Sequence, residues 1–277
     1  IPLLIDGGAD VNAVNNEGGT ALNIASGNNS ASCIPLLIAG GADVNAVDNE
    51  GWTALHAASG FNSASCIPLL IAGGADVNAV NNEGWTALHA ASEFNSASCI
   101  PLLIDGGVDV NAVDNAGLTA LHIASQYNSA SCIPLLIDGG ADVNAVSNEG
   151  YTALHIASGK DSASCIPLLI DVGVNVNAVD NGGGTALHAA SESNSASCIP
   201  LLIDDGADVN AVDNEGYTAL HIASAKDSAS CIPLLIDDGA DVNAVDNEGY
   251  TALHIASAKD SASCIPLLID DGADVNA

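Results

Sequence analysis

DNEGYTALHIASAKDSASCIPLLIDDGADVNAV, residues 213–245, is one copy of a 33-residue sequence that repeats along the whole chain. The eight cysteines recur at intervals of 33 residues, and so do the seven histidines. Such a period is typical of an array of stacked structural units, so the repeat decides the fold. We predict a single array over residues 1–277 and expect it to be a segment of a longer one. Residues 1–14 end one copy, and further copies begin at residues 15, 48, 81, 114, 147, 180, 213 and 246.

Each copy contains two short apolar segments with the features of helices. In the quoted copy, ALHIAS follows Thr218, whose hydroxyl can accept the first free backbone N–H groups of a helix. CIPLLI is closed by Gly239, a residue type that commonly ends a helix. The arm ADVNAV then runs into a turn at Asn-Glu-Gly. Neither helix would be stable alone at this length, so stacking of copies must supply the buried surface.

A proline stands inside every CIPLLI segment. It would cost about 3 kcal/mol in a helix interior, but in the first turn its missing N–H group would have been unpaired anyway. If Ser230 is the N-cap, Pro233 is the third helical residue and no hydrogen bond is lost. We therefore predict that the second helices begin at about Ser32, Ser65, Ser98, Ser131, Ser164, Ser197, Ser230 and Ser263.

The cysteine of each copy suggests a reactive thiol, a metal ligand or a small buried side chain. Equivalent residues on packed helices lie about 8 to 10 Å apart, which is too far for a disulfide. Zinc needs four ligands around one point, whereas each copy offers one Cys and one His on different helices, so we predict no metal site. We interpret the cysteines as buried apolar residues, and unpaired thiols then indicate a reducing compartment, cytoplasmic or otherwise intracellular.

The charge of the chain excludes several classes of partner. Asp and Glu number 34 against 3 lysines, and the formal net charge is −31. Such a chain repels nucleic acids and anionic membrane surfaces, and its natural complement is a basic protein or a cation. Neither a Gly-x-Ser-x-Gly motif nor a phosphate-binding loop is present, so we predict no enzymatic activity and no cofactor.

The segment TALHIA or TALHAA, followed by GADVNA, resembles the ankyrin repeat, whose signature is Thr-Pro-Leu-His-x-Ala. The resemblance covers the whole chain. Ala replaces the usual Pro, Asn23 replaces the histidine of the other copies, and the family pattern does not require the second-helix proline. The resemblance implies an all-α repeat solenoid of stacked helix-turn-helix units with short hairpin arms. It also implies that Thr and His tie adjacent copies together by side-chain hydrogen bonds.

The resemblance further implies a protein-interaction scaffold whose concave groove is lined by the arms and by the ends of the first helices. The fifth and fourteenth places of the copy fall there, vary between copies, and hold every aromatic and every basic residue. We predict that these side chains are exposed and bind a basic, partly apolar partner protein. The alternative is that the residues at these places have drifted after duplication because they lie on a solvent-exposed face without a function. They are Trp52, Trp85, Leu118, Tyr151, Tyr217 and Tyr250 at the fifth place and Phe61, Phe94, Tyr127, Lys160, Lys226 and Lys259 at the fourteenth.

Acidity increases along the chain, which suggests a second function. The first two full copies carry net charges of −2 and −3, whereas the last three carry −5 each, partly through pairs such as Asp204 and Asp205. An acidic structural spacer that responds to Ca²⁺ or Mg²⁺ is therefore the alternative, although the arms lack the ligand spacing of an EF-hand. The last copy keeps its apolar residues, so we also expect the ends to fray or to associate end to end.

Overall fold

The computed structural model describes residues 1–276 of the chain, which form 17 short helices with irregular connections. The chain divides into two compact units, unit 1 (Ile1–Asp142) and unit 2 (Val143–Ala277). None of the helices within residues 1–276 has the length and apolar character needed to span a membrane.

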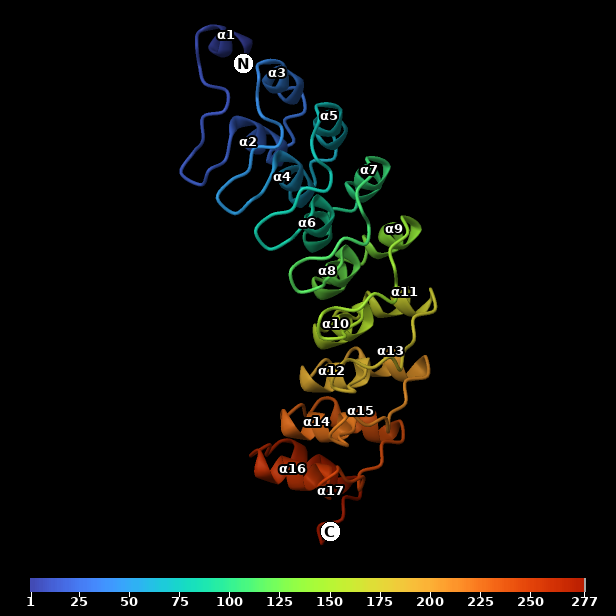
Figure 1. Ribbon diagram of the computed structural model, residues 1–277. Helices are drawn as coiled ribbons and strands as arrows, with labels where there is room; N and C mark the ends of the chain where they lie inside the picture. The colour runs from blue at the N-terminus through green and yellow to red at the C-terminus, as the bar shows by residue number, and fades with distance from the viewer. Residues whose placement is uncertain (277) are drawn as a thin grey trace. The chain divides into compact units, whose positions relative to one another are not determined.

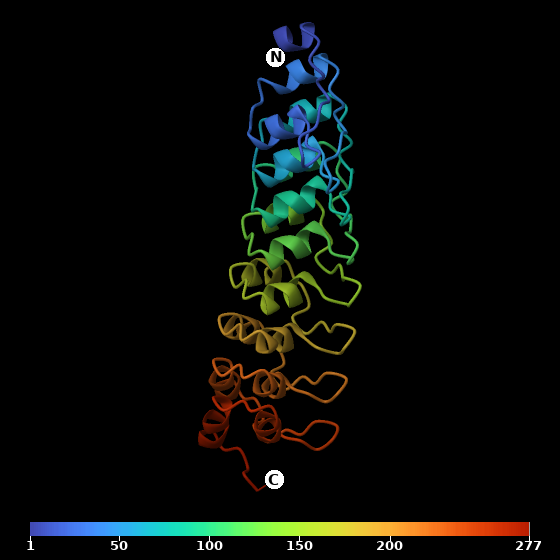
Figure 2. The ribbon, with the colours of Figure 1, turned by 90° about the vertical axis from the view of Figure 1, so that its left-hand side faces the viewer.

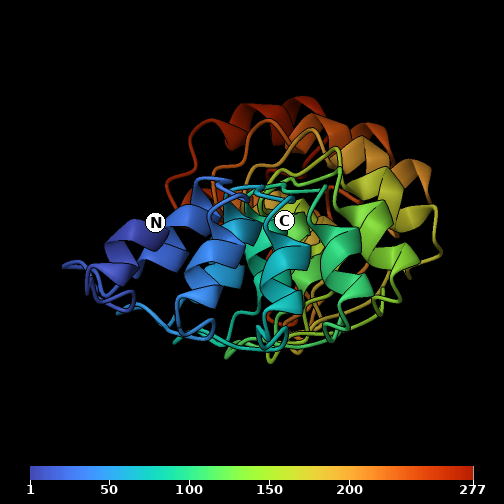
Figure 3. The ribbon, with the colours of Figure 1, turned by 90° about the horizontal axis from the view of Figure 1, so that it is seen from above.

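Unit 1 consists of two rows of helices (Figure 1). Each first helix of a copy packs against the second helix of the same copy and against the first helices of the neighbouring copies. Seen from above, the helices of unit 1 lie side by side with similar directions (Figure 3). The first helices are α2 (Ala21–Gly27), α4 (Ala54–Gly60), α6 (Ala87–Glu93) and α8 (Ala120–Gln126). The second helices are α1 (Pro2–Asp6), α3 (Ile34–Ala39), α5 (Ile67–Ala72), α7 (Ile100–Asp105) and α9 (Ile133–Asp138).

Unit 2 repeats the same arrangement. Within it, the arms extend to one side of the helices (Figure 2). The first helices are α10 (Ala153–Gly159), α12 (Ala186–Glu192), α14 (Ala219–Ala225) and α16 (Ala252–Ala258). The second helices are α11 (Ile166–Ile170), α13 (Ile199–Asp204), α15 (Ile232–Asp237) and α17 (Cys264–Asp270). The all-α repeat fold expected from the sequence is thus confirmed in each unit.

The first helices begin directly after the threonine, as predicted. The hydroxyl of Thr53 accepts the N–H of His56, and Nδ1 of His56 accepts the N–H of Thr53 at 3.2 Å. This reciprocal arrangement is a capping box in which histidine takes the usual place of Glu or Gln. In the first full copy, Oδ1 of Asn23 accepts the N–H of Thr20 at 3.3 Å, so the asparagine preserves the same cap.

The second helices begin one residue later than predicted in all but one complete copy. The N-cap is the cysteine, and the proline is the second helical residue, as at Pro68 in α5. Only α17 has the predicted serine, Ser263, as its N-cap. The serine makes no side-chain cap, and its hydroxyl is bonded to the preceding copy instead: Ser65 donates to Oδ1 of Asn29 at 2.6 Å, and Ser263 of α17 donates to Asp227 in the same way. Asn29 has a φ of +53°, which places its side chain beside the next copy.

The core of each copy is made of small and branched apolar side chains. Leu55, Ala58, Ile67 and Leu70 are at most 1% exposed in the second full copy, and the same places are buried in the copies that begin at residues 81, 114, 147, 180 and 213. Seven of the eight cysteines are buried, Cys33 is partly buried, and all eight are free thiols. The interpretation of the cysteines as small core residues is therefore confirmed for the seven buried positions.

Three side chains of each copy hold the arms and join neighbouring copies. Oδ1 of Asp48 accepts the N–H groups of Glu50 and Trp52, both at 2.9 Å, which closes the arm turn. Between copies, the amide of Asn45 donates to the carbonyl of Gly74 at 3.2 Å. His56 Nε2 lies 2.8 Å from the carbonyl oxygen of Trp85, so the expected tie between copies through histidine is confirmed. Within residues 1–276 the arms contain only isolated bridges, such as Val14 to Thr20, and no longer strand.

Candidate protein-interaction groove

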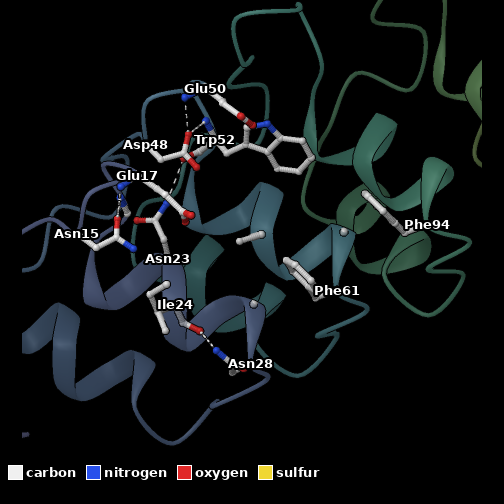
Figure 4. Close-up of a pocket in the computed structure, with 14 residues that line it drawn as sticks. Asn15, Glu17, Asn23, Ile24, Asn28, Asp48, Glu50, Trp52, Phe61 and Phe94 are labelled. Carbon is white, nitrogen blue, oxygen red and sulfur yellow. Dashed lines mark hydrogen bonds between the residues drawn. The ribbon is translucent and has the colours of Figure 1, made fainter.

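A hollow of about 420 Å³ opens in unit 1 between the arms and the first helices (Figure 4). The arms of the first two full copies line it with Asn15, Glu17, Asp48, Glu50 and Trp52. Helices α2 and α4, together with the residues that follow α4 and α6, complete the lining. The groove positions of successive copies therefore meet in one space.

Three aromatic side chains lie toward one end of this hollow (Figure 4). Phe61 is 75% exposed and Phe94 is 56% exposed, whereas Trp52 is half-buried. Two of the rings come close to Gly60, the last residue of α4. A β-carbon on Gly60 would lie 3.4 Å from Cδ2 of Phe94 and 3.7 Å from Cζ3 of Trp52. A glycine at this place therefore leaves open a space that two aromatic rings border.

Asn15, Glu17 and Asn23 lie toward the other end of the hollow, and Asp48 and Glu50 lie beside Trp52 (Figure 4). Oδ1 of Asn15 accepts the N–H groups of Glu17 and Gly19, which fixes the first arm as Asp48 fixes the second. Glu17 and Glu50 are exposed, and Asp48 is half-buried. Residues 1–142 contain neither lysine nor arginine, so no basic side chain of unit 1 neutralises these carboxylates.

Below the aromatic rings, the buried histidine side chains make structural hydrogen bonds, as His56 does. The ring centroids of Trp52 and His56 are 5.6 Å apart. Burial away from water lowers the pKa of His56, and the hydrogen bond to the Trp85 carbonyl opposes this only in part. Because Nδ1 accepts the threonine N–H, the ring proton lies on Nε2 and is donated to the next copy. Both ring nitrogens of His56 therefore make structural hydrogen bonds and are not available for catalysis.

The fourteenth-place side chain reaches the thirteenth place of the preceding copy, a pairing that the sequence analysis did not identify. Phe94 lies against Gly60, as described above. Tyr127 is hydrogen-bonded to Glu93, and in unit 2 Nζ of Lys226 lies 2.8 Å from Oε1 of Glu192. The signal in the sequence is that glycine precedes both phenylalanines by 34 residues, whereas glutamate precedes Tyr127 and Lys226 at the same spacing.

The predicted partner-binding residues have different exposures at the two places. All fourteenth-place residues of the prediction are exposed, as expected. The fifth-place residues are half-buried except Tyr250. The aromatic rings at this place lie beside the capping histidine of the same copy. Trp85 is further held by a 3.1 Å hydrogen bond from Nε1 to Asp114. The hollow brings together Trp52, Phe61 and Phe94; the other predicted residues do not line it.

The acidic residues do not converge on a metal site in the part of the chain that the structure covers. No group of three or more His, Cys, Asp or Glu side chains in residues 1–276 is arranged to hold an ion. The twin aspartates, such as Asp204 and Asp205, are exposed at the ends of second helices.

Comparison with known proteins agrees with this architecture. A family model described as ankyrin repeats (3 copies) matches residues 1–81, 58–147, 123–213 and 201–277. No curated protein sequence matches the chain significantly. Among solved structures, the crystal structure of the human ASB11 ankyrin repeat domain matches with a TM-score of 0.72 and 27% sequence identity. That match covers 80% of this chain and 99% of the other. The chain belongs to the ankyrin repeat family, whose members are generally non-enzymatic protein-interaction modules.

Proposed function

We propose that this chain is a protein-interaction scaffold that binds a basic, partly apolar segment of a partner protein in the groove between its arms and first helices. The observation that carries the proposal is the hollow of unit 1, in which aromatic rings and carboxylates line one space. Trp52, Phe61 and Phe94 are its aromatic lining. The other residues assigned to partner binding hold equivalent places: Trp85, Leu118, Tyr127, Tyr151, Lys160, Tyr217, Lys226, Tyr250 and Lys259.

The aromatic side chains support the proposal because the fold leaves much of their surface exposed. Phe61 and Phe94 keep more than half of their surface in contact with water. Large, rigid aromatic side chains dominate the binding energy of many interfaces when a partner covers them. A partner segment with apolar residues would gain energy by excluding water from these rings.

The charge of the chain supports a basic partner. A net charge of −31 accelerates the approach of a positively charged segment and repels acidic ones. Unit 1 lacks lysine and arginine, so its groove carboxylates do not have to break an internal ion pair when a basic segment binds.

A reducing, intracellular location is part of the proposal. The cysteines are free, and burial raises the pKa of the Cys198 thiol to about 12 and that of Cys99 to about 11. Thiols that remain protonated at neutral pH are poor nucleophiles, so these residues serve packing.

The test is a peptide selection followed by binding measurements. Peptides selected from a random library against the chain should be rich in basic and apolar residues. Replacing both Trp52 and Trp85 with alanine should weaken their binding at least about 30-fold, or about 2 kcal/mol, mainly through faster dissociation. The melting temperature should change little, because neither ring is fully buried.

A control variant with alanine at Val80 and Val113 removes exposed apolar side chains from the same two copies, outside the hollow. It should bind the selected peptides as the unaltered chain does. Selection of acidic peptides, or equal binding by the tryptophan variant, would contradict the groove assignment.

A further inference from the structure

We infer that the hollow of unit 1 is a receptor for one basic side chain of the partner, arginine in preference to lysine, and that Gly60 determines this specificity by keeping the hollow open. The inference rests on the proposed function and deepens it, because it assigns one chemical group of the partner to one site. Two observations support this inference: the side chains at the two ends of the hollow, and the residues that other copies carry at the place of Gly60.

The aromatic end of the hollow fits the planar head or the apolar stem of a long side chain. The rings of Trp52 and Phe94 both lie within van der Waals reach of the point where a β-carbon on Gly60 would be. A side chain that enters above Gly60 would therefore lie close to both rings. A cation on an aromatic face is attracted by the ring's electrons, and the flat guanidinium group also stacks on the ring.

The acidic end of the hollow has no lysine or arginine of unit 1 to neutralise its carboxylates. Glu17, Asp48 and Glu50 line the hollow, and no basic side chain occurs anywhere in residues 1–142. In unit 2, Lys226 lies 2.8 Å from Glu192, the residue at the place of Gly60. A basic side chain that reaches the unit 1 carboxylates from outside gains charge-assisted hydrogen bonds, and arginine can form two such bonds in parallel.

The place of Gly60 is filled by larger residues in other copies. Glu93, Gln126 and Glu192 stand at the equivalent last position of their first helices. The fold therefore accepts a long side chain at this place. Gly60 lies in α4 and does not have a positive φ, so no backbone feature requires glycine there. What glycine provides is the open space between Trp52 and Phe94.

The first experiment measures binding of single amino acids to the chain by nuclear magnetic resonance. The probe is N-acetyl-arginine amide, and the signal is the indole N–H of Trp52, assigned with a Trp52→Phe variant. The Trp52 signal should shift and saturate with the arginine probe. N-acetyl-lysine amide should bind more weakly than the arginine probe. The corresponding amide of citrulline, which has the shape of arginine without its charge, should bind at least tenfold more weakly than the arginine probe. No shift at about 50 mM arginine probe, or equal shifts with citrulline, would overturn the inference.

The second experiment fills the hollow with a side chain that another copy carries at the same place. Gly60→Gln, which copies Gln126, should abolish the shift of Trp52 while the melting temperature stays the same or rises, because glycine is a poor helix former. Gly159→Gln is the matched control, since Gly159 ends α10 at the same place in unit 2. It should leave arginine binding unchanged. Unaltered binding by Gly60→Gln would show that the hollow is not the receptor.

The two proposals fail in different ways. Peptides from the selection that lose affinity in the Trp52 and Trp85 double variant, but bind Gly60→Gln normally, would support the groove and reject the receptor for a basic side chain. Loss of affinity in both variants, with arginine required in the peptide, would support both.

Discussion

One histidine per copy links the start of a helix to the next copy of the array. Its Nδ1 caps the first helix, and its Nε2 binds a carbonyl in the following arm, as His89 does with Thr86 and Leu118. Asn23 performs both tasks in the first full copy, where its Nδ2 lies 3.1 Å from the Trp52 carbonyl oxygen. The two hydrogen bonds, rather than the imidazole ring, are thus what this position requires.

Substitution of His89 tests this conclusion. His89→Ala should lower the free energy of unfolding by about 3 kcal/mol, because it removes the cap and leaves the Leu118 carbonyl without its buried donor. His89→Asn should cost about 1 kcal/mol or less, since Asn23 makes both bonds. Urea denaturation of both variants measures the difference. Equal destabilisation by Ala and Asn would show that ring packing is the main contribution.

Mild acid should destabilise the array through the same residues. Burial lowers the pKa of His56, His89, His155 and His221 below the ordinary value of 6.5. The unfolded chain therefore takes up protons before the folded chain does, so stability is full above about pH 6.5 and declines as the pH falls below it. The urea midpoint should therefore decrease as the pH is lowered from about 7.5 to about 5.5. Carboxylates titrate below this range.

A variant with asparagine at all four histidines is the control for this measurement. Its urea midpoint should depend less on pH in that window. If the pH dependence of the urea midpoint is unchanged in this variant, groups other than the four histidines cause it.

At the scale of helices, the sequence was sufficient for those boundaries that depend on local chemistry. The threonine that starts each first helix was predicted correctly. The glycine that follows the second helix, for example Gly41 with a φ of +88°, was predicted correctly except at α11, which ends earlier, at Ile170. The start of the second helix was wrong by one residue in most copies, and the hydroxyl of the predicted cap is bonded to another copy, as Ser65 is to Asn29. The hollow was not predictable for a similar reason, since its contacts join different copies.

The first helical position offers a direct test of helix-start chemistry. Ala21 is the first residue of α2 and is exposed, so proline should fit there without a clash. Ala21→Pro should raise the free energy of unfolding by about 0.4 to 1 kcal/mol, because it restricts the unfolded chain. Thermal denaturation measures the gain. Ala54→Pro is the comparison: Ala54 is only 1% exposed, so crowding should reduce or reverse the effect.

At the scale of the whole molecule, charge opposes folding. The chain carries −31, and each of its last three copies carries −5, with exposed twin aspartates at the ends of second helices. Like charges at these spacings repel, and the C-terminal end of a helix is unfavourable for an acid. Salt should therefore have an unusually large effect on stability.

The melting temperature should rise with NaCl as the charges are screened. Because no three acidic groups in residues 1–276 converge on one point, CaCl₂ at the same ionic strength should give a similar rise. Calorimetry in both salts makes the comparison. An additional effect of Ca²⁺ that persists at high NaCl concentration would support the acidic spacer as the function.

The ends of the array should be less stable than its middle. No residue of α1 is buried, and Leu3 and Leu4 are 88% and 69% exposed. Hydrogen exchange should be faster in α1 than in α6, and sedimentation should show self-association that Leu3→Ser with Leu4→Ser reduces. Equal protection of α1 and α6, with a monomer at all concentrations, would contradict this expectation.

The distribution of lysines has a practical consequence for proteolysis. Lys160, Lys226 and Lys259 each follow a first helix of unit 2, and the next residue in every case is an aspartate with a positive φ. Trypsin cuts after lysine or arginine, so it has no site before residue 160. Digestion therefore reports local opening of unit 2 alone, and the peptide that carries the hollow is released in one piece.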